Sequence, residues 1–198
     1  MSFGAFRGQP CSFLWASPRV RLWRCTDGCE AGWVVITLIP AAPGDVDYVI
    51  DLKATVLRAD LERAVGAWSP SRSAQRVRDH FSPAWTRIVR DDDERVGTIT
   101  MRPEGGAVWL EMFYLEPVAQ GRGIGSAVLE IVLAEVADRD VQLQVLDGSR
   151  ARPLYERHGF VLVSVDGVDD ILVRSARPAD AGQPHGGETV HARAGVLD

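Results

Sequence analysis

The feature that most constrains this chain is a glycine-rich turn between an apolar run and a helical pattern. Residues 120–126 read Gln-Gly-Arg-Gly-Ile-Gly-Ser, after the apolar residues 107–115 and before a helical repeat at 127–137. Glycine permits positive φ, and the first amides of a helix have no partner within the helix. A strand, a glycine turn and a helix in this order form a cradle for phosphate groups. The sequence therefore predicts a site for a polyanionic ligand here, with Arg122 as an added cation.

The spacing of these glycines excludes two common phosphate-binding motifs. A dinucleotide fingerprint needs G-x-G-x-x-G, and a phosphate loop needs a lysine followed by Ser or Thr after its last glycine. Neither pattern is present, and what remains is Q-x-x-G-x-G following Leu-Glu-Pro at 115–117. Such a short motif, taken alone, is also compatible with an ordinary tight turn.

A second segment has its own pattern. Residues 140–146 alternate apolar and polar side chains, which predicts a strand. The following residues predict a short helix, with Ser149 as its N-cap and Gly159 as its stop. Ala151, Leu154 and Tyr155 fall on one face of that helix at helical spacing.

Taken together, the two segments resemble the signatures of the GNAT acetyltransferase superfamily. The first matches the pyrophosphate loop [RQ]-x-x-G-x-[GA], and the second matches N-x-x-A-x-x-L-Y-E-[KR]-x-G-F. The resemblance implies that the loop holds the pyrophosphate of acetyl-coenzyme A. The chain departs from the family at Ser149, where the family usually has Asn, and at Tyr114, where similar relatives often have Glu.

The resemblance also implies which residues contact the cofactor. Leu115, Pro117 and Val118 match the positions beside the pantetheine, in the gap where the strand before the loop splays from its neighbour. The remaining cofactor positions are Gln120, Gly121, Arg122, Gly123, Ile124, Gly125, Ser126, Ser149 and Ala151.

Two residues are candidates for the catalytic groups. Tyr155 matches the family tyrosine near the thioester sulfur, where a phenol can donate a proton to a departing thiolate. The alternative for Tyr155 is a core tyrosine packed beside Leu154 and Phe160. Glu111 interrupts an apolar strand and is the best acidic candidate for the base, and strand alternation places it with Phe113. A salt bridge or an exposed face is the alternative for Glu111.

Composition limits the class of protein. The formal net charge of −5 argues against nucleic-acid binding, and no apolar run is long enough to span a membrane. The first residues have no continuous apolar core, so we expect no signal peptide and a cytoplasmic location. The three cysteines, at 11, 25 and 29, favour incidental reduced thiols over a metal site.

The chain divides into three parts. Residues 1–32 have poor periodicity and predict an irregular extension, and residues 176–198 predict a disordered tail. Between them, residues 33–175 predict one α+β domain, with three strands in a run before the cofactor helix. That order implies a mixed, mostly antiparallel central sheet with helices on both faces, which is also the GNAT element order.

The sequence thus predicts an acetyl-CoA-dependent N-acetyltransferase, with acetyl-CoA as co-substrate and a primary amine of a small molecule as acceptor. A protein amine is the second choice. The alternative from another class is a non-catalytic acyl-CoA-binding or regulatory module with the same fold. We expect neither a nucleic acid nor a membrane as partner, and the sequence is compatible with a homodimer.

Overall fold

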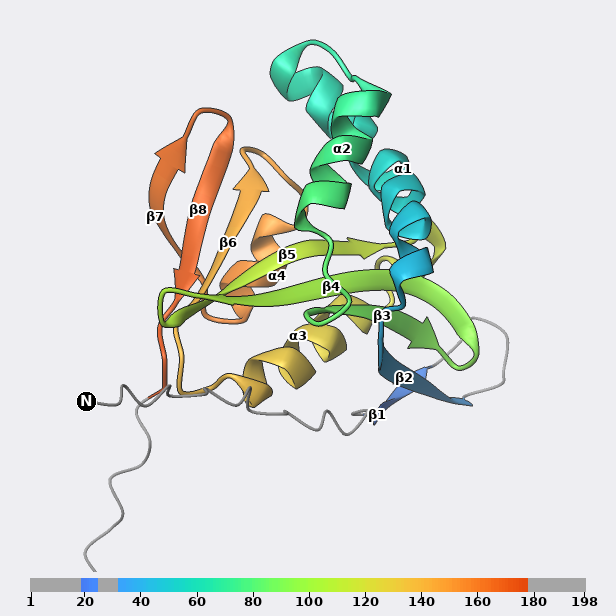
Figure 1. Ribbon diagram of the computed structural model, residues 1–198. Helices are drawn as coiled ribbons and strands as arrows, with labels where there is room; N and C mark the ends of the chain where they lie inside the picture. Colours follow the sequence, from blue (N-terminus) through green and yellow to red (C-terminus); the bar gives the residue numbers. More distant parts are fainter. Residues whose placement is uncertain (1–18, 25–31, 178–198) are drawn as a thin grey trace, which may run out of the picture.

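The computed structural model describes residues 19–24 and 32–177 (Figure 1). The helical elements are η1 (Pro43–Asp45), α1 (Val46–Val65), α2 (Pro70–His80), η2 (Pro117–Ala119), α3 (Ile124–Glu135) and α4 (Arg152–Arg157). The strands are β1 (Arg19–Arg24), β2 (Gly32–Pro40), β3 (Thr86–Asp91), β4 (Glu94–Glu104), β5 (Ala107–Leu115), β6 (Val141–Leu146), β7 (Val161–Asp166) and β8 (Asp169–Arg174). Within the described ranges no helix is long and apolar enough to cross a membrane.

The strands form one sheet in the order β1-β2-β3-β4-β5-β6-β8-β7. Every neighbouring pair is antiparallel except β5 and β6, which are parallel. A parallel pair needs a crossover connection, and α3 supplies it between β5 and β6. The predicted mixed, mostly antiparallel sheet is therefore confirmed.

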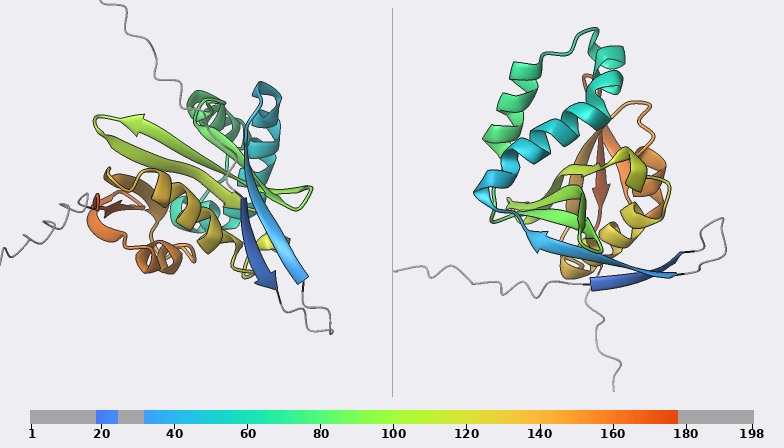
Figure 2. Two further views of the ribbon diagram at one scale, coloured as in Figure 1. Left: turned by 90° about the horizontal axis from the view of Figure 1, so that it is seen from below. Right: turned by 90° about the vertical axis from the view of Figure 1, so that its right-hand side faces the viewer.

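Helices cover both faces of the sheet, as predicted (Figures 1 and 2). On one face α3 is apolar nearly all round, and its buried Val128, Leu129 and Val132 join the large core cluster with Phe160. On the other face α1 and α2 pack a smaller cluster over β5, with Val49, Val77 and Met112 at its centre. The site described below lies between these two layers.

The strand β5 has the bounds that the sequence predicts, β6 begins one residue later than predicted, and α3 begins three residues earlier than the predicted helical repeat. One prediction was wrong in part. Residues 1–32 were expected to be irregular, but Arg19–Arg24 forms β1 and pairs antiparallel with β2. Arginine and apolar residues alternate in this segment, so it has the period of a strand, and the pairing with β2 fixes that strand. All three cysteines, and most of the predicted tail, lie outside the described residues.

Candidate active site

The central strands β5 and β6 diverge shortly after they begin. They pair only at Val108 with Val141 and at Trp109 with Gln142, although β5 continues to Leu115. Beyond Trp109 the edge of β5 that faces β6 is left without a strand partner among the described residues. Unpaired backbone groups along a strand edge can hydrogen-bond an extended ligand. This divergence is the splay that the resemblance predicts.

A β-bulge interrupts β5 shortly after Trp109, the last residue that pairs with β6. Thr100 of β4 is opposite Glu111 and Thr98 is opposite Tyr114, so two residues of β5 face Ile99 alone. Met112, the first of these two, has a φ of 45°, in the left-handed region that a methionine seldom adopts. The extra residue shifts the alternation of side chains along the strand.

The bulge overturns the predicted orientation of Glu111. Strict alternation places Glu111 on one face with Phe113, opposite Met112 and Tyr114. In the structure, Phe113 packs against the core cluster around α3, whereas Met112 and Tyr114 pack in the cluster under α1 and α2. Glu111 lies 3.9 Å from His80 of α2, so it belongs to the α1 and α2 face.

The glycine turn has the conformation that the phosphate cradle needs. Gly121 and Gly123 have φ of 70° and 79°, and no atom lies within 4 Å of a Cβ built on either residue. Conformation, not lack of space, therefore requires glycine at both positions. Gly123 is the N-cap of α3 and supplies no side-chain cap, so the first amides of the helix stay available to a ligand.

Other predicted cofactor residues shape this loop. Gln120 donates through Nε2 to the Leu115 carbonyl at 2.9 Å, which ties the loop to the end of β5. Arg122 pairs with Asp91 at 3.2 Å and donates to the Val118 carbonyl at 3.2 Å, so its guanidinium is already engaged. The other predicted loop residues take three positions: Pro117 opens η2, the Ile124 side chain is fully buried, and Ser126 is half-buried in the first turn of α3.

The loop and the second motif meet at Gly125. A Cβ on Gly125 would lie 3.1 Å from Leu154 Cδ2 and 3.6 Å from Leu115 Cδ1. Ala151 and Leu154 pack against the same core cluster. Tyr155 packs its ring against Phe113, with ring centroids 6.5 Å apart. The structure therefore brings together the residues that the two motifs predicted separately.

Tyr155 is deeply buried. Only 6% of its surface is exposed, and Phe160 lies edge-on at 5.9 Å between centroids. Burial raises the pKa of Tyr155 well above its ordinary value. Burial is also the main reason that the pKa of Tyr114 is raised, and ionisation of the neighbouring Tyr155 would raise it further. Both phenols are consequently protonated at every working pH. Tyr155 combines the packing role with a position beside the splayed strand.

Glu111 is held in a salt bridge. Arg102 donates through Nη2 to Oε1 at 2.9 Å and through Nε to Oε2 at 3.2 Å, a bidentate pair. Arg102 also donates to Glu104 at 2.6 Å. The hydrogen bond to Glu111 is the main reason that the pKa of Arg102 is raised. Both carboxylate oxygens of Glu111 already accept hydrogen bonds from Arg102, so the structure favours the salt-bridge alternative.

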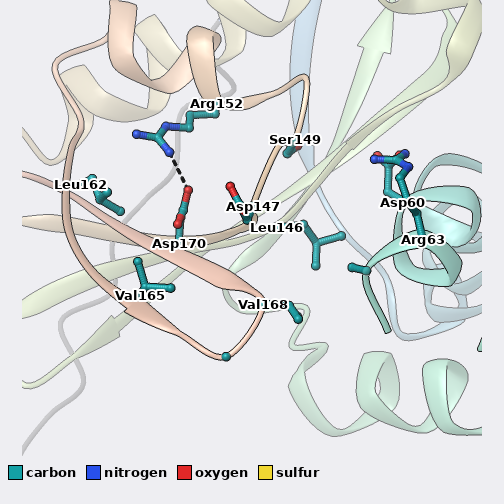
Figure 3. A pocket seen from close by; sticks show the side chains of 12 residues that line it. Asp60, Arg63, Leu146, Asp147, Ser149, Arg152, Leu162, Val165, Val168 and Asp170 are labelled. Carbon is teal, nitrogen blue, oxygen red and sulfur yellow. Dashed lines mark hydrogen bonds and ion pairs between the residues drawn. The ribbon is translucent and has the colours of Figure 1, made fainter. Parts of the chain in front are cut away.

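A hollow of about 530 Å³ opens beyond the C-terminal end of β6 (Figure 3). Its walls come from segments far apart in the chain: the end of α1, the loop after β6, the start of α4 and the β7–β8 hairpin. The lining residues are Asp60, Arg63, Ala64, Leu146, Asp147, Ser149, Arg152, Leu162, Val165, Gly167, Val168 and Asp170. Of the predicted site residues, Ser149 alone lines it.

Sequence reasoning missed the charged residues of this hollow. Asp170 is 3% exposed and accepts from Arg152 Nη1 at 2.7 Å, the pair drawn dashed in Figure 3. Asp147, by contrast, makes no salt bridge within the described part of the chain. Ser149 accepts from the Ala151 amide at 3.2 Å and caps the turn before α4, two residues earlier than the helix N-cap. The available signal was the pair of aspartates, Asp169 and Asp170, that opens the strand β8.

Two cations, Lys53 of α1 and Arg76 of α2, lie on the opposite layer. Lys53 continues the helical row of Val46, Val49 and Ile50, which pack in the cluster under α1 and α2. Burial, and then the charge of Arg76, lower the pKa of Lys53. Neither cation forms a salt bridge with another described residue.

Comparison with known proteins agrees with this geometry. Residues 83–162 match the family model described as acetyltransferase (GNAT) domain. Residues 83–162 are therefore similar to a GNAT acetyltransferase domain. The matched residues run from just before β3 into β7 and so include both motifs, the bulge and the splay. No curated protein matches the chain in sequence.

Solved structures share the fold at low sequence identity. PH1933 from Pyrococcus horikoshii OT3 is 16% identical with a TM-score of 0.59, covering 72% of this chain and 99% of its own. PaiA N-acetyltransferase from Thermoplasma acidophilum, solved in complex with coenzyme A, is 18% identical with a TM-score of 0.56, covering 71% and 98%. An acetyltransferase from Thermus thermophilus is 19% identical with a TM-score of 0.56, covering 71% and 96%. These likenesses establish the GNAT fold.

Proposed function

We propose that this protein is an acetyl-CoA-dependent N-acetyltransferase whose acceptor is the primary amine of a small molecule. The observation that carries the proposal is the divergence of β5 from β6 beside the glycine turn. Gly121 and Gly123, with positive φ and open space around them, fit the close approach of a pyrophosphate. The hollow that we assign to the acceptor lies at the end of β6 and is lined by Ser149 of the second motif.

The residues around the splay would have separate roles in binding the cofactor and in transferring a proton. When bound, acetyl-CoA would supply an acetyl group as a thioester. The first amides of α3 would hold the pyrophosphate, and the free edge of β5 would hydrogen-bond the pantetheine. Holding both reactants in place accounts for much of the catalysis in such a transfer. Tyr155, kept protonated by burial, would donate its proton to the departing sulfur.

The dimensions and charge of the hollow support a small amine over a protein. Its volume of about 530 Å³ falls in the usual range for small-molecule sites. Asp147 lines it without an ion-pair partner among the described residues, and a carboxylate of this kind attracts an ammonium group. The expected cytoplasmic location forms part of this proposal.

Three features favour the non-catalytic alternative. Glu111 is tied to Arg102, and Tyr114 and Ser149 replace residues that similar relatives use. A domain with these features would bind acyl-CoA without transferring the acyl group. In that case the hollow would bind a regulatory ligand.

The test is free-thiol release from acetyl-CoA with a panel of small primary amines, alongside calorimetry of coenzyme A binding. We expect binding, and turnover on at least one amine. Binding with no turnover on any small amine or peptide amine would favour the module. No binding of coenzyme A at all would overturn both functions.

A further inference from the structure

The strand β7 forms an exposed apolar edge of the sheet. It is the last strand in the order and pairs only with β8 among the described strands. All six of its residues are exposed. The described surface has exposed large apolar side chains at Val161, Leu162, Val163 and Val165 of β7, and elsewhere only at Val65 and Val118. An edge of this kind favours pairing with another strand.

Protective features that proteins place on such edges are scarce here. Edge strands usually carry lysine, proline, inward charges or bulges. The only charge on β7 is Asp166, at its end. A register shift between Leu162 and Ser164 bends the strand, but the residue that it adds is another exposed valine, Val163. The composition of β7 is therefore that of an interface strand.

The two ends of the β7–β8 hairpin carry opposite charge. Arg157 ends α4 just before β7, and Arg174 lies beside the start of β7, because Val161 pairs with Val173. At the other end, Asp166 pairs with Asp169. Burial is the main reason that the pKa of Asp169 is raised. The charge of Arg76 lowers this pKa, whereas Asp166 and Asp170 raise it. Arg157 and Asp166 have no ion-pair partner within the described ranges, so each end has unsatisfied charge.

We propose that β7 pairs antiparallel with β7 of a second copy of this chain, across a two-fold axis. Antiparallel self-pairing sets the basic end of one strand beside the acidic end of the other, so the charges become complementary at both ends. A two-fold axis also places the apolar patch of one copy against the same patch of the other copy, so that both patches are buried. The segment after β8 is a poorer occupant, because residues 178–198 contain two prolines and four glycines, which strands disfavour.

The same pairing affects the acceptor hollow. Leu162 and Val165 of β7 line the hollow (Figure 3). A second strand beside β7 extends this wall and fixes the hairpin that carries Val168 and Asp170. The dimer therefore completes one side of the hollow. Because β7 is short, we expect a dimer that dissociates on dilution.

The experiment is sedimentation velocity of the full chain over a wide range of concentration. We expect a dimer for the parent and a monomer for Val163→Lys, which places a charge in the paired edge. The matched control is Val65→Lys, since Val65 and Val163 are both 55% exposed and Val65 lies on α1. The control should remain dimeric, and melting curves should show that both variants fold.

Charge reversal tests the antiparallel arrangement itself. Arg157→Glu and Asp166→Arg should each weaken the dimer, and the double variant should restore it. A parent that stays monomeric at every concentration overturns the proposal. So does a Val163→Lys variant that dimerises as the parent does, or a dimer that appears only when residues 178–198 are deleted. All of these measurements are made without ligand, so they are independent of the enzymatic proposal.

Discussion

The two halves of the site are built in different ways. The half that we propose for the cofactor, residues 115–126 and 149–155, consists mainly of backbone from two contiguous stretches, each with a local motif. The half that we propose for the acceptor consists of side chains from α1, the loop after β6, α4 and the β7–β8 hairpin, which come together only in the folded chain. Backbone recognition of this kind depends on a few glycines, whereas the acceptor half depends on individual side chains. Changes in the first half should therefore have larger and more uniform effects.

The largest effect should come from Gly123→Asp. The substitution places a strained side chain at a φ of 79° and a negative charge beside the first amides of α3. We expect coenzyme A affinity to fall by about 100-fold or more, on the scale of losing charge-assisted contacts. Calorimetry measures this, with Gly44→Asp as the control because Gly44 is exposed and far along the chain from the turn. Unchanged affinity for coenzyme A in a folded Gly123→Asp variant would show that the glycine turn does not bind the pyrophosphate.

Tyr155→Phe should lower turnover by about 10²-fold, the usual scale of general acid catalysis, with little change in coenzyme A affinity. The phenyl ring keeps its packing against Phe113 and Phe160, and only the hydroxyl is lost. Tyr114→Phe removes the neighbouring phenol and should cost less. Steady-state kinetics on a confirmed amine distinguish the two. Equal losses in both variants would mean that neither phenol alone is the acid.

Glu111→Gln should have a moderate effect, a loss of turnover of less than about tenfold, because both of its carboxylate oxygens already accept hydrogen bonds from Arg102. The pH dependence of kcat/KM should keep the shape of the parent. A loss of several hundredfold, or a missing acidic limb in the profile, would instead identify Glu111 as the base. Arg102→Met is the matched variant, since it removes the other side of the same salt bridge.

The smallest effect concerns Lys53→Met, on the α1 and α2 side of the site. The pKa of Lys53 is lowered in the folded protein, so its charged form is disfavoured there relative to the unfolded chain. While Lys53 is protonated in both the folded and the unfolded protein, it lowers the free energy of unfolding. This destabilisation disappears as pH rises toward the pKa of Lys53 in the unfolded chain. We expect Lys53→Met to raise the melting temperature slightly near neutral pH, with a gain that shrinks at alkaline pH. A gain that is constant with pH would point to packing and not to charge.

Much of the cofactor half was predictable because its determinants are local. Positive φ at Gly121 and Gly123 and the helical period of α3 each depend on residues close together in the chain. The same reasoning predicted β5 at both ends, whereas the N-cap of α4 is Ala151 and not the predicted Ser149. It missed β1, whose alternation is short and is stabilised by pairing with β2.

The sequence by itself predicted most of the elements and the two motifs that resemble GNAT signatures, because propensity, periodicity and turn chemistry act over a few residues. Only the tertiary structure decided which face each side chain of β5 takes. The bulge opposite Ile99 reverses the alternation after Met112, and it exists because β4 and β5 pair in a particular register. The tertiary structure also decided the partner of Glu111, the make-up of the hollow and the exposure of β7, since each depends on contacts between segments far apart in the chain.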